Sequence, residues 1–159
     1  MTSNGRALPA ALTRPADPTT RGRTLVRIVL GAALAFAGAS HLTVARGEFR
    51  AQVPEFVPLD ADLVVLASGI AEITLGAALM LLARRRVPVG WAVALFLVAV
   101  FPGNIAQWLH ARDAFGLDTD AKRFMRLFFQ PVLVTAVLWS TGAWRDRPRR
   151  GPGSTGTPD

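Results

Sequence analysis

The chain contains no cysteine and no tyrosine, and it has only two histidines. Without cysteine it cannot build a disulfide framework, a Cys-x-x-Cys thiol relay, a thiolate zinc site or a cysteine-ligated iron–sulfur cluster from its own residues. The motifs that mark common soluble active sites are also missing, including His-Glu-x-x-His, a phosphate-binding glycine loop and a Gly-x-Ser-x-Gly turn. We therefore predict no metal site and no active site of these types.

Apolar residues, in contrast, are abundant and are gathered into blocks. The hydrophobic residues make up 51% of the 159-residue chain. They form four blocks of about 20 residues, the length that crosses a bilayer core of ~30 Å as a helix. The blocks cover residues 24–42, 61–83, 87–109 and 124–142. The sequence thus predicts an all-α integral membrane four-helix bundle, with one domain at residues 24–142 embedded in the lipid bilayer.

The two ends of the chain have a different composition. Residues 1–23 and 143–159 are rich in Pro, Arg, Thr and Gly and lack hydrophobic periodicity, which predicts disordered basic tails. The first block also has a competing interpretation as a signal peptide, because Ala37-Gly38-Ala39 resembles a cleavage site. We favour an uncleaved helix, since the small residues Gly31, Ala35 and Ala39 are spaced for close helix packing.

Charge placement predicts the orientation of the bundle. Most of the 18 Lys and Arg residues fall in the two tails and in the loop at Arg84–Arg86, whereas most acidic residues fall in the loops on the other side. The positive-inside rule then places both termini in the cytoplasm, and we expect a multi-pass protein of a bacterial inner membrane. The net charge of +7 is explained by this topology, so we expect no nucleic-acid partner.

Glu72 is the most informative single residue, because it lies near the middle of the second block. An ionisable group at the centre of a membrane helix costs about 2.5–3.5 kcal/mol on insertion scales, so its side chain should face the bundle. Ser68 and Gly76 lie one turn away on either side and complete an inward stripe. Two interpretations stay open: a proton-handling or ligand-binding carboxylate, hence the candidate catalytic group, or a neutral acid that hydrogen-bonds between helices.

Other blocks supply polar side chains at comparable positions, in the half of the bundle assigned to the outer side. Together they predict a polar pocket that opens outward, lined by His41, Ser68, Glu72, Asn104, Gln107, Arg126 and Gln130. For Asn104 and Gln107 the alternative is interhelical hydrogen bonding, and for Arg126 it is snorkelling to the membrane surface. The connector at residues 43–60 carries apolar residues between prolines and is either a cover over this pocket or an ordinary exposed loop.

Short segments of three blocks resemble the DoxX-like family of membrane proteins. They are Ser40-His41-Leu42 in the first block, Ser68-Gly69-Ile70-Ala71-Glu72-Ile73-Thr74-Leu75-Gly76 in the second and Val100-Phe101-Pro102-Gly103-Asn104-Ile105 in the third. The resemblance covers roughly residues 24–142. It implies a four-helix membrane bundle in which His41, Glu72, Pro102 and Asn104 belong to a shared polar framework.

The resemblance implies several functions, because the relatives differ in role. Some are named for a thiosulfate:quinone oxidoreductase subunit, others associate with redox-stress enzymes, and related eukaryotic proteins act as assembly chaperones. We therefore expect an accessory or redox-associated membrane subunit that binds a small lipophilic ligand, with quinone as the candidate cofactor, around Glu72. A redox-enzyme partner would supply the electrons, and a homo-oligomer is the other candidate assembly. The competing hypotheses are a non-enzymatic assembly factor or scaffold and, less favoured, a small-solute transporter, so whether the chain is an enzyme stays open.

Overall fold

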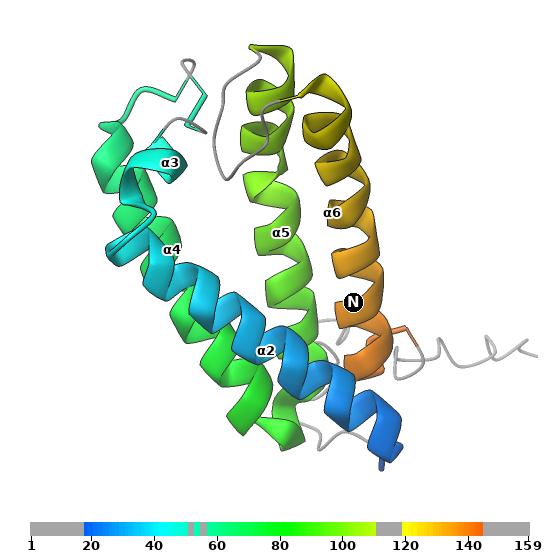
Figure 1. The fold of residues 1–159 in the computed structure, drawn as a ribbon. Helices are drawn as coiled ribbons and strands as arrows, with labels where there is room; N and C mark the ends of the chain where they lie inside the picture. The colour runs from blue at the N-terminus through cyan, green and yellow to red at the C-terminus, as the bar shows by residue number, and fades with distance from the viewer. Residues whose placement is uncertain (1–17, 51–52, 55–56, 111–118, 145–159) are drawn as a thin grey trace, which may run out of the picture.

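Four long helices form the body of the protein in a computed structural model, which describes residues 18–50, 53–54, 57–110 and 119–144. The elements in chain order are α2 (Arg21–Leu42), α3 (Arg46–Arg50), α4 (Ala61–Leu81), the 3₁₀ turn η1 (Ala83–Arg85), α5 (Arg86–Leu109) and α6 (Asp120–Thr141). The long helices run alternately up and down, so α2 begins and α6 ends at the same end of the bundle as η1 (Figure 1). The described residues contain no strand, and the predicted all-α four-helix bundle is confirmed.

Each long helix is long and apolar enough to cross a membrane. Large apolar side chains such as Leu25, Phe36, Leu95 and Phe129 are exposed on the outside of the bundle. Water would make such a surface costly, whereas lipid accepts it. The fold is therefore that of a multi-pass helical membrane protein.

Side-chain caps set the start of three helices. At the start of α2, the side chain of Thr20 accepts a hydrogen bond from the backbone N–H of Arg23. The side chains of Asp60 and Thr119 accept hydrogen bonds from backbone N–H groups in the same way at the starts of α4 and α6. Several boundaries differ from the predicted ones, and the largest differences are the starts of α2, at Arg21, and of α6, at Asp120. The first turns of these helices are polar, so the apolar pattern alone placed the starts three and four residues late. Residues 1–17 and 145–159, where tails are predicted, lie outside the described residues.

Glycines bring α2 and α4 into close contact. A Cβ atom placed on Gly38 would lie 2.5 Å from the carbonyl oxygen of Gly69, and one on Gly31 would lie 2.8 Å from that of Gly76. The predicted inward stripe on α4 is confirmed at Glu72 and Gly76, which are buried, while Ser68 is half-buried beside the buried Gly69. The predicted series on α2 is wrong at its last member, because Ala39 is exposed and Gly38 makes the contact instead.

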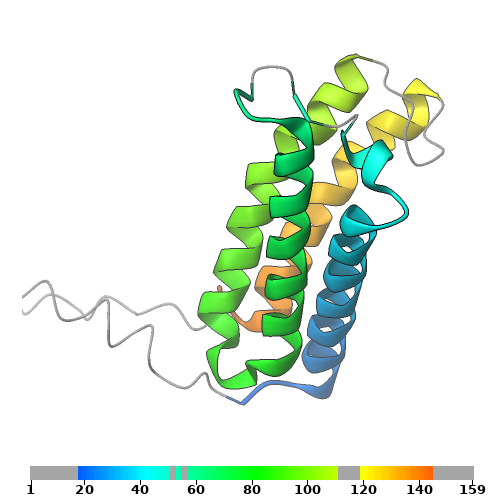
Figure 2. The ribbon, with the colours of Figure 1, turned by 90° about the vertical axis from the view of Figure 1, so that its left-hand side faces the viewer.

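The helices form two closely packed pairs, α2 with α4 and α5 with α6, and the pairs contact each other less extensively (Figures 1 and 2). Toward the η1 end the space between the pairs is filled by the buried side chains of Leu79, Val93, Leu97 and Val137. Toward the opposite end, which carries α3, the pairs diverge (Figure 1).

Two buried arginines close the η1 end of the bundle. Nη1 of Arg27 donates a hydrogen bond to the carbonyl oxygen of Met80, 3.2 Å away, near the end of α4. Nε of Arg86 donates to the carbonyl oxygen of Thr141, 3.0 Å away, at the end of α6. The last carbonyls of a helix have no intrahelical partner, so each arginine satisfies a neighbouring helix end. The predicted loop at Arg84–Arg86 is thus shorter, because Arg86 is the buried first residue of α5.

Candidate ligand-binding site

A cavity of about 670 Å³ lies between the two helix pairs and reaches from the α3 end of the bundle to the apolar core. Its walls come from all four long helices and from the segment that joins α2 to α4. The floor is apolar and includes Leu79, Val93 and Val137 of the core. Both the size and the mostly apolar lining are typical of small-molecule sites, which usually span about 300–1,000 Å³ and contain a few polar groups.

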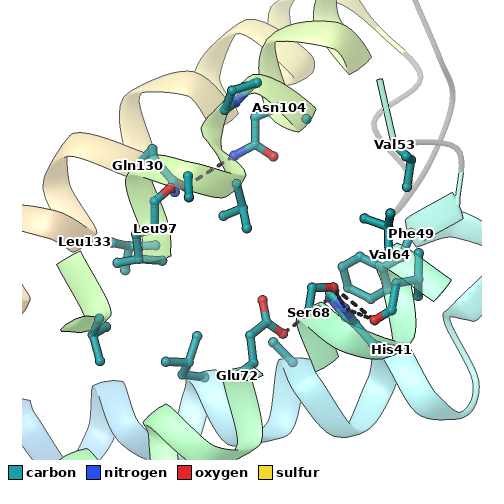
Figure 3. A pocket seen from close by; sticks show the side chains of 18 of the residues that line it. His41, Phe49, Val53, Val64, Ser68, Glu72, Leu97, Asn104, Gln130 and Leu133 are labelled. Atoms are coloured by element: carbon teal, nitrogen blue, oxygen red, sulfur yellow. Dashed lines mark hydrogen bonds and ion pairs between the residues drawn. The ribbon is translucent and has the colours of Figure 1, made fainter. Parts of the chain in front are cut away.

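One set of polar side chains lies on the α2–α4 wall. Nδ1 of His41, in α2, lies 3.0 Å from Oγ of Ser68, in α4, and Oγ of Ser68 donates to the carbonyl oxygen of Val65. Nε2 of the same histidine lies 3.3 Å from Oε2 of Glu72. His41 therefore links the serine and the glutamate of α4 into one chain of contacts (Figure 3).

Glu72 is only 8% exposed, yet its carboxyl group points into the cavity (Figure 3). Oε2 lies within ion-pair distance of His41, but the two atoms are not aligned for a hydrogen bond. Among the described residues, this buried oxygen has no hydrogen-bond partner. Buried polar atoms in native proteins are nearly always satisfied, so the carboxyl group has capacity left for a ligand or a bound water.

A second set of polar side chains lies on the α5–α6 wall, across the cavity from the first (Figure 3). Nε2 of Gln130 donates to the carbonyl oxygen of Leu97, and Oε1 of Gln130 accepts from Nδ2 of Asn104 at 3.2 Å. Nη1 of Arg126 donates to Oε1 of Gln107, also at 3.2 Å. These bonds join α5 to α6, which is the structural role considered for Asn104 and Gln107.

The structure thus brings the predicted site residues together around one space. Six of them line the cavity: His41, Ser68, Glu72, Asn104, Arg126 and Gln130. Gln107 is buried behind the wall and contacts the cavity indirectly, through Arg126. Whether these side chains bind a ligand stays a prediction.

The connector between α2 and α4 covers the α3 end of the cavity. Phe49 of α3 lies over His41 with the ring centroids 3.4 Å apart, and Val53, Pro54 and Val57 also line the cavity. We call these four residues, Phe49, Val53, Pro54 and Val57, the cover. Their position agrees with the covering interpretation of this connector, while Phe56, the other aromatic residue of the loop, lies outside the described residues.

An ion-pair cluster holds α3, and with it Phe49 of the cover, against α4. Nε and Nη2 of Arg46 lie 3.0 and 2.6 Å from the two carboxylate oxygens of Asp62, and Nε of Arg50 lies 3.4 Å from the same carboxylate. Bidentate pairs of this kind are geometrically specific. Sequence reasoning missed the cluster, because the partners lie 16 residues apart across an irregular connector. In the part of the chain that is described, no three His, Asp or Glu side chains gather as a metal site.

Four apolar spans around a partly polar cavity define the class: a helical membrane protein with an internal pocket. A sequence model of the family described as Domain of unknown function (DUF8561) matches residues 30–141, and the chain belongs to this family. The match covers α2 from Leu30 onward through the end of α6, so it includes every residue of the cavity. Neither the curated proteins nor the solved structures contain a match to the chain. The resemblance to DoxX-like proteins stays a prediction.

Proposed function

We propose that the protein is a membrane-embedded accessory subunit that binds a small lipophilic molecule with an oxygen-bearing head, a quinone being the best-fitting class. The observation that carries the proposal is the carboxyl group of Glu72, which is buried, lacks a hydrogen-bond partner among the described residues and points into a mostly apolar cavity. An apolar cavity with few polar groups suits a molecule whose ring is apolar and whose oxygens need hydrogen bonds.

The polar side chains have distinct roles under this proposal. Glu72 accepts or supplies a proton at a ligand oxygen, and His41, held by Ser68, sets the orientation of the carboxyl group. Asn104, which lines the opposite wall, would hydrogen-bond a second oxygen of the ligand. Two hydrogen-bonding walls facing each other match a molecule with oxygens on opposite edges.

Reduction of a quinone to a quinol takes up electrons as well as protons, and the electrons need a source. The chain has no cysteine, and it shows no cofactor motif. A partner redox enzyme would therefore supply electrons while this chain binds the quinone and handles the protons. The resemblance to DoxX-like proteins, some of them named for a quinone-linked oxidoreductase subunit, supports the same assignment.

Equilibrium binding of a decyl-substituted benzoquinone tests the proposal. The protein is placed in lipid nanodiscs and binding is followed by quenching of tryptophan fluorescence. Glu72→Gln should weaken binding about tenfold, because the hydrogen bond between the acidic group of Glu72 and the ligand is lost. Thr74→Val is the matched control, because Thr74 lies on the exposed face of α4 and bonds only its own helix backbone at Ile70. Unchanged binding in a folded Glu72→Gln protein would contradict the proposal.

A second candidate function is a non-enzymatic assembly factor or scaffold, and one observation favours it. The side chains of Gln130 and Gln107 are both engaged in bonds between α5 and α6, as residues that only hold the bundle together would be. Purification of the protein with its lipids separates the two functions. A client protein without any bound small molecule supports the scaffold, whereas a bound quinone supports the pocket.

A further inference from the structure

The cavity reaches the lateral surface of the bundle as well as its interior. Three residues that line it are exposed: Ala33 on α2, and Ala99 and Pro102 on α5. An exposed residue can line an internal cavity only where the cavity is open to the outside or wide enough to expose its own wall. Because Ala99 lies on the face of α5 opposite Leu97, which faces the core, the cavity extends around α5 toward the outside.

The surroundings of Ala99 place this opening in the hydrocarbon layer. Leu95 and Val98, close to it on α5, are 66% and 57% exposed. The segment of α5 that contains them carries no polar side chain from residue 92 up to Asn104. Ala99 lies near the middle of a helix that crosses the membrane, so lipid chains surround it. Of the four contacts between neighbouring long helices, the one between α4 and α5 is the least extensive, which leaves this side of the cavity the least obstructed.

The end of the cavity that faces the α3 side is closed in comparison. The cover lies across it, with the ring of Phe49 tilted against that of His41, and Asp62 pairs with Arg46 and Arg50 of α3. A water-soluble molecule arriving from this side would have to displace the cover, of which Phe49 belongs to the ion-paired helix α3. A molecule dissolved in the bilayer would meet the exposed side chains of Ala99 and Pro102.

We propose that the cavity exchanges its ligand sideways with the bilayer, through an opening bordered by Ala99 and Pro102 of α5, and that the cover stays closed during this exchange. This inference rests on the proposed function, and it restricts the ligand class to molecules that partition into the hydrocarbon core. A lateral opening changes only the barrier between free and bound ligand. Narrowing it should slow association and dissociation by the same factor and leave the dissociation constant unchanged.

Stopped-flow binding of the decyl-substituted benzoquinone in nanodiscs measures both rates. Ala99→Phe narrows the opening and should slow both association and dissociation on the order of tenfold. The matched control is Ala92→Phe, since Ala92 lies two turns away on the same exposed face of α5 and does not line the cavity. Unchanged rates in Ala99→Phe, or slower rates in Ala33→Phe alone, would overturn the proposed opening.

The cover is tested separately, and the absence of natural cysteines makes the experiment clean. In the double variant Arg46→Cys, Asp62→Cys, a short bis-methanethiosulfonate reagent bridges α3 to α4. Both rates should stay within about twofold of those of the same variant before bridging. If bridging abolishes binding or slows either rate by much more than twofold, the ligand enters through the cover. That result would overturn the inference. If the unmodified protein binds no probe at equilibrium, the proposed function itself fails, which is a different result from altered rates.

Discussion

Nε2 of His41 and Oε2 of Glu72 lie 3.3 Å apart across the interface of α2 and α4. The two residues meet because each follows a close-packed glycine by three positions, Gly38 in α2 and Gly69 in α4. Residues three apart share a helix face, so the glycine contact sets the spacing at which the histidine and the carboxyl group meet. Packing and the candidate site are thus coupled through one short stretch of the interface.

Substitution of Gly38 tests this coupling. Gly38→Ala should lower the free energy of unfolding by about 1–3 kcal/mol, because the new methyl group would lie 2.5 Å from the carbonyl oxygen of Gly69. Gly22→Ala on the same helix is the control, since a Cβ there has no neighbour within 4 Å. Denaturation in mixed detergent micelles measures the free energy of unfolding of both variants. Equal stability of the two variants would show that the helices do not approach as closely as described.

Glu72 and Gln130 should respond differently to replacement by leucine. Gln130→Leu should lower the free energy of unfolding by about 1–2 kcal/mol, because the bonds to Leu97 and Asn104 are lost. Glu72→Leu should leave it unchanged or raise it, since Oε2 has no hydrogen-bond partner among the described residues. The same detergent denaturation compares them. A large loss of stability in Glu72→Leu would indicate a structural role for the carboxyl group.

Arg86 should matter more than its neighbour Arg85. Arg86→Met removes the donor to the carbonyl oxygen of Thr141 and should lower the free energy of unfolding by about 1–3 kcal/mol. Arg85 is exposed, so Arg85→Met should change it by less than about 0.5 kcal/mol. Thermal unfolding in detergent distinguishes the two. Similar effects would mean that the charge of the loop, not the cap on α6, stabilises this end.

Orientation in the membrane is predicted from the distribution of charge and can be measured with single cysteines. A membrane-impermeant maleimide added to intact cells should label Gly47→Cys, at the α3 end, and spare Arg85→Cys, at the η1 end, until the membrane is permeabilised. Both positions are exposed, so access to the reagent depends on the side of the membrane. The opposite labelling pattern would reverse the assigned topology.

The four spans were predictable from sequence because hydrocarbon imposes a simple requirement of length and apolarity. Glu72 was predictable for a related reason, since a carboxyl group at mid-span must turn inward. The contacts that define the site were harder to predict. Nothing in the sequence pairs Arg46 with Asp62, or places Phe49 over His41, because these contacts depend on the path of an irregular connector. The buried Arg27 likewise reads as an ordinary basic residue at a helix start until the end of α4 lies beside it.

Mass spectrometry of small molecules extracted from the purified protein tests the central claim most directly. Protein isolated with its native lipids should carry a quinone or a comparable oxygen-bearing lipophilic molecule in near-stoichiometric amount. Val100→Phe, which adds bulk at a cavity-lining position, should reduce that amount strongly, whereas Ala92→Phe outside the cavity should not. If only phospholipid is recovered, in equal amounts from the unsubstituted protein and from both variants, the account is contradicted.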